Sequence, residues 1–425
     1  SNMSFTLREP EPVEPDQGAV VIKHVRAFVV ASKAAEEKAG GLGDCHAQKD
    51  THWITGAIRP IATPISGHTK YKKNRKSWGI DAIGTMIVEI ELSNGMKGHG
   101  VSIGGEPGCF IVEKHLSRFI EGQDPHNVEL IWDLMWKSTI NYGRKGLPIQ
   151  AISAVDLAIW DALGKLKNTA VFNLLGGKTK ASLPVYATTA NPAAAKKMGF
   201  VGSKFPLPYG PADGEEGMKK NIQLVEEFRK SVGPDFPLMI DCYMALTLPY
   251  AKELAKRIQP FNIKWIEECL HPDDYKGYGE LRSSVSTCMV TCGEHEYTRY
   301  GFRQLLEGGC ADLLQPDVTW CGGITEARRI VALASAYDIP VIPHGSSVYS
   351  YHLQYAFPSC PMAEFLVMSP GGDKIVPYFG SLFTDEPLPK DGKITLSADK
   401  PGFGVTLNVK GLNLKRPYDR TEKKE

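Results

Sequence analysis

The chain has 425 residues, of which 42% are hydrophobic, so it is long enough for two domains with a large buried core. Lysine and arginine together number 49, and aspartate and glutamate 48. This balance leaves no global basic field that would attract nucleic acid or an anionic membrane surface. The expected partner is a small molecule, with no nucleic acid and no membrane.

The nine cysteines are scattered and odd in number, and none forms a Cys-x-x-Cys pair. This pattern argues against a disulfide framework or a zinc cage, and favours a cytoplasmic enzyme with reduced thiols. Residues 1–18 are expected to be a flexible arm in which Ser1-Asn2 is an expression remnant before Met3. They do not have the pattern of a secretory signal, and no stretch of about 18 apolar residues is evident.

Residues 19–148 are predicted to form an α+β domain. Strand-like alternation over 20–30 and 84–92 is followed by the hairpin turn signal at 93–95 and a returning strand at 97–103. Helical spacing follows over 110–120 and 127–139. The stretch 31–80 has little periodicity, and long segments of this kind are usually functional or disordered, with both options open.

Residues 149–395 show a different pattern, in which short apolar runs alternate with helical segments. The predicted strands lie at 183–187, 199–205, 238–241, 264–267, 289–294, 312–315, 339–342 and 363–367. About eight parallel strands over this length close most naturally into a (β/α) barrel. An open doubly wound sheet is the alternative, but its glycine-rich nucleotide signatures are missing from the sequence. The basic tail after residue 407 is expected to be solvated.

Three of these strands end in an acid, namely Asp241, Glu267 and Glu294, which are 26 and 27 residues apart. The C-terminal ends of barrel strands converge on one mouth, where three unpaired carboxylates would repel one another. All-oxygen ligands favour Mg²⁺ as the compensating cation. A single such acid more often caps a helix, but three at matched spacing favour a metal site. Strand alternation predicts that Glu268, beside Glu267, points elsewhere.

Similar spacing continues along the chain: Asp317 lies 23 residues after Glu294, and His344 lies 27 residues after Asp317. A carboxylate beside an imidazole fixes its tautomer and raises its basicity, so this pair is a candidate general base. His344 by itself is equally consistent with a packing role, and its place in the series favours catalysis. Glu364, 20 residues further along, would face the other side of the mouth.

In this order and spacing the motifs resemble the enolase superfamily, in its mandelate racemase-like branch of acid-sugar dehydratases. The matching residues are Ile240-Asp241, Trp265-Ile266-Glu267-Glu268, Gly293-Glu294, Gln315-Pro316-Asp317 with Gly322-Gly323, and Pro343-His344. The resemblance spans residues 20–408. It implies an α/β fold, with a modified (β/α)7β TIM-like barrel and an α+β N-terminal capping domain. Residues 396–425 would return to the cap and then form the basic tail.

Within that branch the strongest likeness is to enzymes that dehydrate L-rhamnonate, carried by 199–200, 267–270, 320–323 and 343–350. The resemblance implies one Mg²⁺ per subunit, held by Asp241, Glu267 and Glu294. His344, oriented by Asp317, would remove the α-proton and then protonate the departing 3-hydroxyl. Glu364 would hydrogen-bond the carboxylate oxygen on which charge builds up. A homo-oligomer, an octamer in the family, is also implied.

Five further residues are candidates for substrate binding, namely His46, Arg75, Lys204, His295 and Trp320. By resemblance His46 and Arg75 would close over the mouth and contact the sugar, although an arginine in a basic run is more often a solvated charge. His295, beside a metal candidate, could reach the site. Trp320 could line the pocket or merely pack.

Lys204 stands where many relatives carry Lys-x-Lys, but here Pro206 replaces the second lysine. Racemisation needs bases on both faces of the substrate, so this change disfavours it. Lys204 is expected either to pair with a metal ligand or to be structural. Alternatives to L-rhamnonate are L-mannonate and L-lyxonate. A non-catalytic scaffold is less consistent with the retained acids, and a metal-dependent hydrolase would need histidine-rich ligands.

Overall fold

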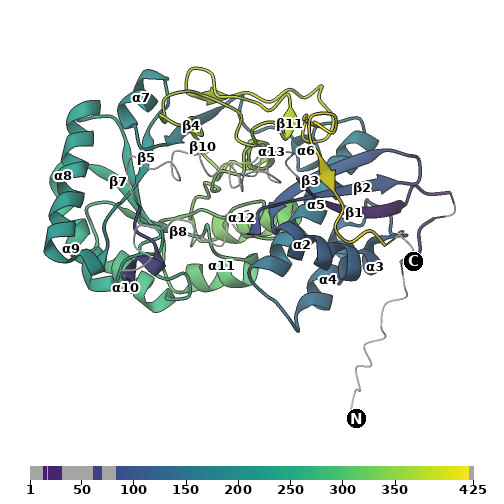
Figure 1. The fold of residues 1–425 in the computed structure, drawn as a ribbon, viewed down its shortest axis with the longest axis horizontal. Helices are drawn as coiled ribbons and strands as arrows, with labels where there is room; N and C mark the ends of the chain where they lie inside the picture. The colour runs from purple at the N-terminus through teal and green to yellow at the C-terminus, as the bar shows by residue number, and fades with distance from the viewer. Residues whose placement is uncertain (1–12, 17, 31–60, 69–82, 421–425) are drawn as a thin grey trace, which may run out of the picture.

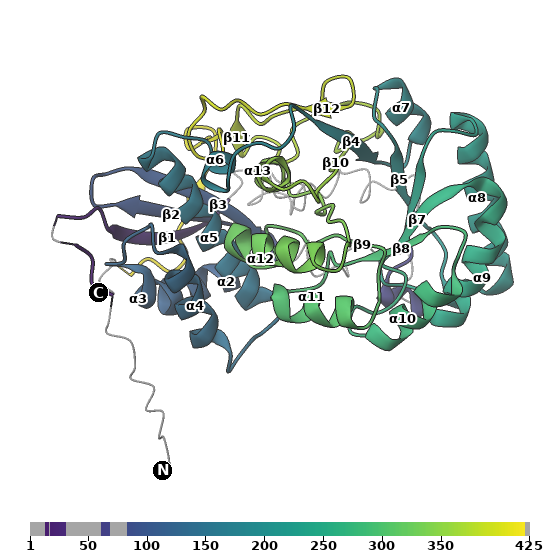
Figure 2. The same cartoon turned by 180° about the vertical axis from the view of Figure 1, so that it is seen from behind.

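The computed structural model describes residues 13–16, 18–30, 61–68 and 83–420. A strand-and-helix cap lies beside a larger curled sheet that is surrounded by helices, as Figures 1 and 2 show from opposite sides. The predicted fold class, an α/β barrel with an α+β N-terminal cap, is confirmed. The predicted domain limits at residues 18, 148 and 395 stay predictions.

The cap contains an antiparallel sheet in the order β14-β1-β2-β3. Its strands are β1 (Ile22–Val30), β2 (Thr85–Leu92), β3 (Lys97–Ile103) and β14 (Leu414–Lys415). The predicted hairpin is confirmed, because β2 and β3 pair from Thr85↔Ile103 to Glu91↔Lys97. The cap helices are α2 (Gly105–Ile111), α3 (Ser117–Ile120) and α4 (Val128–Thr139), with a π-helical turn at Val112–Leu116.

Helix α5 (Leu147–Leu166) packs directly against β3. A Cβ atom on Gly98 would lie 2.2 Å from the carbonyl oxygen of Ala158, and one on Gly100 would lie 2.1 Å from that of Ala154. The two backbones can therefore approach this closely because both strand residues are glycine. By length and composition α5 could cross a membrane, but 94% of its most apolar window is buried inside the protein, as in a core helix.

The barrel sheet runs in the parallel order β10-β4-β5-β6-β7-β8-β9, so the last strand lies beside the first. Its strands are β4 (Leu183–Thr188), β5 (Ser203–Pro206), β6 (Leu238–Asp241), β7 (Ile263–Glu267), β8 (Met289–Cys292), β9 (Leu313–Leu314) and β10 (Ala363–Leu366). The short strand β12 (Lys393–Ile394) pairs antiparallel with β4, and β11 (Phe383–Thr384) with β13 (Thr406–Leu407).

Helices between the strands form the outer layer of the barrel (Figure 1). They are α7 (Pro192–Lys197), α8 (Gly214–Val232), α9 (Leu248–Ile258), α10 (Tyr275–Ser284), α11 (Thr298–Glu307), α12 (Gly323–Ser335) and α13 (Val348–Ala356), with α6 (Val171–Leu174) preceding β4. Single 3-10 turns lie at Pro64–Gly67, Pro211–Asp213 and Gln259–Phe261.

The strand predicted at 339–342 forms only two isolated bridges, Leu314↔Val341 and Asp317↔His344. Pro340 and Pro343 interrupt this segment, and proline has no amide hydrogen to donate to a ladder. The segment still brings His344 beside Asp317.

A tightly packed apolar layer fills the barrel below its mouth. It consists of alternating inward side chains from successive strands, namely Tyr186, Met239, Trp265, Leu313 and Ile342. Each of them is at most 4% exposed to solvent. Because side chains alternate along a strand, the inward residues two positions later stand above this layer, at the mouth.

In its described part, up to Arg420, the C-terminal tail is solvated only in places, because Arg416 docks on the fully buried carboxylate of Glu113. Its Nε lies 2.6 Å from Glu113 Oε1 and its Nη2 lies 2.9 Å from Oε2. Arg420 adds contacts to Glu113 and Glu121. The reason is the buried anion: a carboxylate inside a protein needs charged and hydrogen-bonding partners, and the tail provides them.

Arg416→Ala should therefore lower the free energy of unfolding by about 2 to 3 kcal/mol, since it leaves a buried carboxylate with fewer partners. Thermal or denaturant unfolding measures the change, and Lys410→Ala, in an exposed part of the same tail, is the control. Equal stability of the two variants would contradict this role for the tail.

The cap sheet carries a second charge cluster around Glu89, with Arg26 Nη1 at 2.8 Å, Lys97 Nζ at 3.1 Å and His99 Nε2 at 3.3 Å from its carboxylate oxygens. Burial raises the pKa of Glu89, but these partners outweigh it and lower the pKa to about 2. A depressed carboxyl pKa stabilises the fold above its unfolded value, near 4.5, and this contribution is lost as the pH falls towards 2.

Glu89→Gln should consequently be less stable than the unsubstituted protein at pH 7, by about 1 to 2 kcal/mol after allowance for solvent screening. The difference should shrink as the pH falls from 4.5 towards 2. Melting temperatures of both proteins across this pH range measure it. A difference that stays constant down to the lowest pH at which both fold would rule out the ionised pair as its source.

Candidate active site at the barrel mouth

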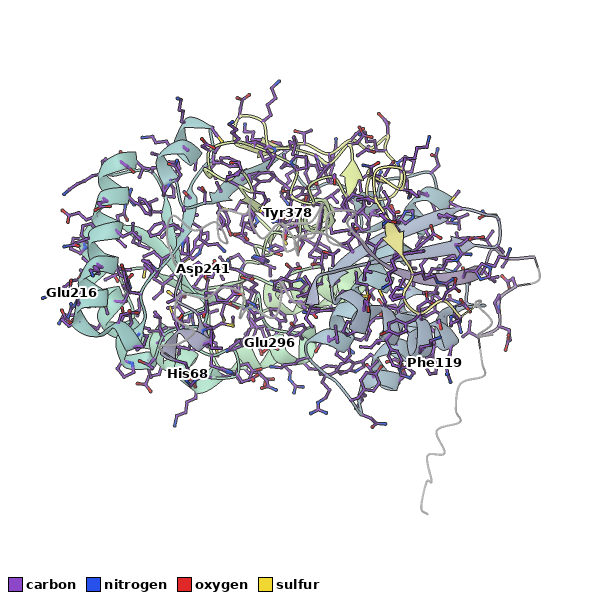
Figure 3. All side chains as sticks on the ribbon, viewed as in Figure 1. His68, Phe119, Glu216, Asp241, Glu296 and Tyr378 are labelled. Atoms are coloured by element: carbon purple, nitrogen blue, oxygen red, sulfur yellow. The ribbon has the colours of Figure 1, made fainter. Side chains whose placement is uncertain are left out.

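Three carboxylates meet at the mouth of the barrel: Asp241, Glu267 and Glu294, named here the acidic triad. Asp241 ends β6 and pairs in register with Glu267 at the end of β7. Glu294 follows β8 by two residues. One oxygen from each lies within 4.8 Å of the others, so one cation can contact all three. Figure 3 labels Asp241 within the barrel region.

The triad is electrostatically unbalanced by itself. Burial raises the pKa of Glu267 to about 8, with further upward contributions from Asp241, Glu364 and Glu294. Burial also raises the pKa of Glu294, to about 7, although His344 and His295 oppose the shift. Carboxylates held this close, and out of water, favour binding of a positive ion. The donor set is entirely oxygen, which fits Mg²⁺.

Lys204 extends from β5 into the barrel beneath the triad and is 1% exposed. Its Nζ pairs with Glu267 Oε1, lies 2.8 Å from Glu364 Oε1 and 3.9 Å from Asp241 Oδ2. Of the two expectations for this lysine, the structure therefore shows a direct ion pair with a triad member. Gln315 supports the same carboxylate from the other side, donating from Nε2 to Glu267 Oε2 at 2.6 Å.

Asp317 and His344 form a buried pair beside the triad, named here the dyad. His344 Nδ1 lies 2.8 Å from Asp317 Oδ2, and its Nε2 lies 3.3 Å from Glu294 Oε1. Burial lowers the pKa of His344, but the carboxylates of Glu294, Glu364 and Asp317 outweigh it and raise the pKa to about 10. One ring nitrogen is thus occupied by Asp317, while the other faces the triad.

Asp317 is itself fixed by three donors on its second oxygen. Oδ1 accepts hydrogen bonds from the amide of Thr319 at 2.7 Å, from the Thr319 hydroxyl at 2.6 Å and from the Ser346 hydroxyl at 2.9 Å. This leaves Oδ2 directed at His344. The threonine and serine were not singled out in the sequence, because neither is unusual two residues after an acid or a histidine.

The prediction that Glu268 points away from the mouth is wrong. Its carboxylate accepts hydrogen bonds from the amide of His295 at 3.0 Å and from His295 Nδ1 at 2.7 Å. Glu268 has a φ of +44°, so it has left the strand conformation and strand alternation no longer applies. Glu268, Glu294 and His295 also converge within 4.8 Å.

Trp320 lies between the two histidines of the mouth. Its ring centroid is 5.5 Å from that of His344 and 5.4 Å from that of His295. It is 2% exposed, so it packs and lines the mouth at once.

Glu364, on β10, faces the mouth from the opposite side but is arranged as an acceptor. Its Oε1 pairs with the Lys204 ammonium and accepts a hydrogen bond from the hydroxyl of Thr188. Its Oε2 accepts a hydrogen bond from the amide of Gly345 at 2.9 Å. Burial raises the pKa of Glu364, but Lys204 and His344 outweigh it and lower the pKa. The predicted hydrogen bond between Glu364 and a carboxylate oxygen of the substrate stays a prediction.

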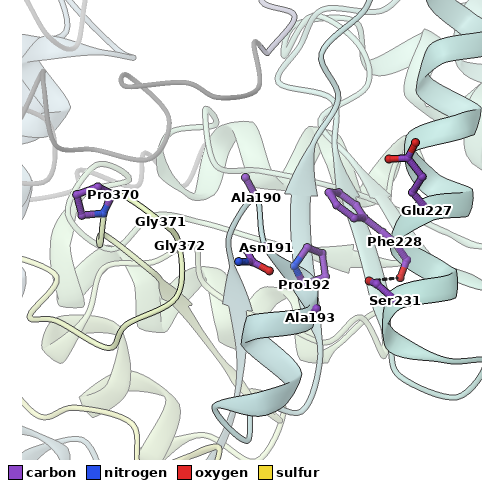
Figure 4. Close-up of a pocket in the computed structure, with 10 residues that line it drawn as sticks. All are labelled: Ala190, Asn191, Pro192, Ala193, Glu227, Phe228, Ser231, Pro370, Gly371 and Gly372. Atoms are coloured by element: carbon purple, nitrogen blue, oxygen red, sulfur yellow. Dashed lines mark hydrogen bonds between the residues drawn. The ribbon is translucent and has the colours of Figure 1, made fainter.

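Two predicted residues, His46 and Arg75, lie outside the described residues. A pocket of about 380 Å³ lies elsewhere, on the outer side of the sheet between α7, α8 and the 370–372 turn (Figure 4). Its lining residues, from Ala190–Ala193, Glu227, Phe228, Ser231 and Pro370–Gly372, are distinct from the triad and the dyad. The site is thus defined by converging charged groups rather than by cavity size.

Two family models match this chain. The N-terminal domain of the mandelate racemase / muconate lactonizing enzyme family matches residues 80–176, and the enolase C-terminal domain-like model matches residues 187–411. The chain belongs to this family of the enolase superfamily. The resemblance inferred from the acid-tipped strands is therefore confirmed.

Relatives cover almost the whole chain. A protein of Saccharopolyspora erythraea described as L-rhamnonate dehydratase is 50% identical over 399 residues, 94% of this chain and 99% of that protein. The crystal structure of rhamnonate dehydratase from Gibberella zeae, complexed with Mg, is 46% identical with a TM-score of 0.88, covering 93% of this chain and 97% of that one. The 3,6-anhydro-D-galactonate cycloisomerase of Zobellia galactanivorans is 30% identical, with a TM-score of 0.68, covering 77% and 94%.

If the triad holds the cation, Glu267→Gln and Glu294→Gln should each weaken Mg²⁺ binding by at least about 100-fold, because each removes a negative ligand. Glu364→Gln is the matched control, since it removes a buried carboxylate that does not belong to the triad, and should change affinity less than about threefold. Titration calorimetry, or electron paramagnetic resonance with Mn²⁺, measures the affinity. A larger loss in the control than in the triad variants would place the cation elsewhere.

Proposed function

We propose that this protein dehydrates a sugar acid, L-rhamnonate first of all, to its 2-keto-3-deoxy product in the presence of Mg²⁺. The observation that carries the proposal is the arrangement of the dyad against the triad, with His344 Nε2 3.3 Å from Glu294 Oε1. The names of the relatives that are 50% and 46% identical support the substrate, and the Mg in one of their structures supports the metal.

Asp241, Glu267 and Glu294 would hold one Mg²⁺ per subunit. When bound, the cation supplies positive charge opposite the substrate carboxylate, which makes the neighbouring α-proton more acidic. The buried Lys204 holds Glu267 in place from below through its ion pair. The ligand geometry is thereby preorganised before substrate binds.

His344 would act as the base and then as the acid. The carboxylates around His344 raise its pKa, so the ring is neutral when a bound cation would offset their charge. Asp317 occupies Nδ1, so the lone pair of that neutral ring is on Nε2 and can take the proton from C2. The same Nε2–H would then protonate the 3-hydroxyl as the C3–O bond breaks, releasing water. The resulting enol becomes the ketone by gaining a proton at C3 and losing the proton of its hydroxyl. His344 is neutral after the dehydration, and it can supply the C3 proton once solvent has reprotonated Nε2.

Lys204 is not positioned as a second base, because its ammonium is enclosed by Glu267 and Glu364 and its pKa is raised by them against the effect of burial. Dehydration needs a single base, whereas racemisation needs one on each face. We place Glu364 as the acceptor that fixes Lys204 and the amide of Gly345, next to the base.

His295 and Trp320 would contact the substrate beside His344, and His46 and Arg75 would bind its distal hydroxyls or carboxylate. His295 has Nδ1 engaged by Glu268, and its Nε2 lies 4.0 Å from Glu294 Oε1, which turns it towards the triad. Arginine suits a carboxylate because its planar fork makes two parallel hydrogen bonds. These assignments complete the proposed substrate contacts.

We further propose a cytoplasmic homo-oligomer, by family resemblance an octamer. The described cysteines are all free thiols, which supports a reducing compartment. Light scattering coupled to size-exclusion chromatography determines the number of subunits.

Incubation with Mg²⁺ and a panel of L-rhamnonate, L-mannonate and L-lyxonate, scored for 2-keto-3-deoxy acids, tests the function. L-rhamnonate should give the highest kcat/KM, and His344→Asn should lower kcat by at least about 10³-fold while Mg²⁺ still binds. His271→Asn, at an exposed histidine, is the control.

Three outcomes would count against the proposal. Turnover of none of the acids by the metal-bound protein would exclude dehydration of this substrate class. Activity retained by His344→Asn but lost in Lys204→Met would assign the base to the lysine. Restoration of a chelated enzyme by Zn²⁺ but not by Mg²⁺ would overturn the metal assignment.

A further inference from the structure

The loop at 316–323, between β9 and α12, carries Asp317 and Trp320 and is held both by barrel residues and by residues of the cap and of α5. The Ser102 hydroxyl on β3 donates to the carbonyl oxygen of Thr319 at 2.6 Å. Trp132 Nε1 on α4 donates to the Gly322 carbonyl at 2.8 Å. The Gly322 amide donates to the Ser153 hydroxyl of α5 at 2.9 Å. These contacts join segments about 170 to 220 residues apart in the sequence.

From Ser102 a continuous set of buried hydrogen bonds leads to the base. Ser102 binds the carbonyl of Thr319; the amide and hydroxyl of Thr319 bind Asp317 Oδ1; and Asp317 Oδ2 binds His344 Nδ1. Ser102 is 3% exposed, Thr319 6% and Asp317 1%. Because these groups are buried, water does not compete for their hydrogen bonds. Each bond therefore restricts the orientation of the next group.

We propose that Ser102, a cap residue outside the barrel, is a positioning residue for the Asp317–His344 dyad. By fixing the peptide plane after Thr319, it holds the Thr319 amide and hydroxyl against Oδ1, which leaves Oδ2 to orient His344. The same peptide plane leads into Trp320, which lies against the His344 ring.

The position of Ser102 is itself rigid. β3 lies against α5 at glycine-to-backbone contacts, and α5 supplies Ser153 to the same loop. The orientation of Asp317 and His344 in the barrel thereby depends on the packing of the cap against α5 and the loop at 316–323. The inference rests on the proposed function for its catalytic meaning, although the positioning itself is measurable without turnover.

The first test compares Ser102→Ala with Ser102→Thr and Ser117→Ala. Ser117 is the matched control, because it is also a fully buried cap serine that donates to a carbonyl, that of Glu113 at 2.9 Å, away from the loop. Ser102→Ala should lower kcat about tenfold and leave KM within about twofold, the size expected for loss of one buried hydrogen bond. Ser102→Thr, which keeps the hydroxyl, should recover most of kcat.

The second test is hydrogen exchange by mass spectrometry on the peptide covering 316–323, in the same proteins. In this loop the amides of Trp320 and Cys321 also donate to the Asp317 carbonyl, at 3.0 and 2.8 Å. Exchange here should be faster in Ser102→Ala than in Ser117→Ala and unchanged in Ser102→Thr. If Ser102→Ala does not fold, Thr319→Val tests the next bond of the set, because it removes the hydroxyl that donates to Asp317 Oδ1, with lower kcat and unchanged KM expected.

Equal kcat and equal loop exchange in Ser102→Ala and Ser117→Ala would overturn the inference. An equal loss of kcat in both serine variants would also overturn it, because it would show a general stability effect. If the unsubstituted protein converts no sugar acid, the proposed function fails, and the exchange comparison still decides whether Ser102 orders the loop.

Discussion

Repulsion among buried carboxylates is the constraint on which this structure depends. Asp241, Glu267 and Glu294 come from successive strand ends and are held within 4.8 Å of one another. For Asp241 and Glu267 the parallel ladder sets this distance, so these two carboxylates cannot separate without breaking strand pairing. The apolar layer beneath them excludes water and lowers the local dielectric, which makes unbalanced charge costly. Positive charge must therefore come from within the protein and from a bound cation.

Lys204 supplies the internal share of that charge. It stands between Glu267 and Glu364, so one ammonium links the metal side of the mouth to the side that carries β10. Lys204 is the first lysine of the Lys-x-Lys pattern, and Pro206 stands at the position of the second. This leaves Lys204 with the role of a counter-ion. In the dyad, His344 has one nitrogen fixed by Asp317 and the other directed at the triad.

Sequence patterns predicted most strands and helices well, because apolar runs and helical spacing are local. They failed at one run that prolines interrupt and at two places where a tertiary contact overrides the local pattern. Pro340 and Pro343 reduced an apolar run to isolated bridges. Glu268, in a left-handed conformation just past β7, turned back to His295, which no alternation rule anticipates. The basic tail docked on Glu113, an acid that is unremarkable in the sequence and buried in the fold.

The sequence by itself determined the series of acids and the histidine at matched strand spacing, since each ends a short apolar run and parallel strands must bring such ends together. It also determined the family, through the order of those motifs. Tertiary structure decided the partners: that Lys204 pairs with Glu267, that Glu268 holds His295, and that Ser102 reaches the loop of Asp317. Such contacts join side chains 27 to 217 residues apart, so they depend on packing distances and backbone conformations that no local pattern encodes.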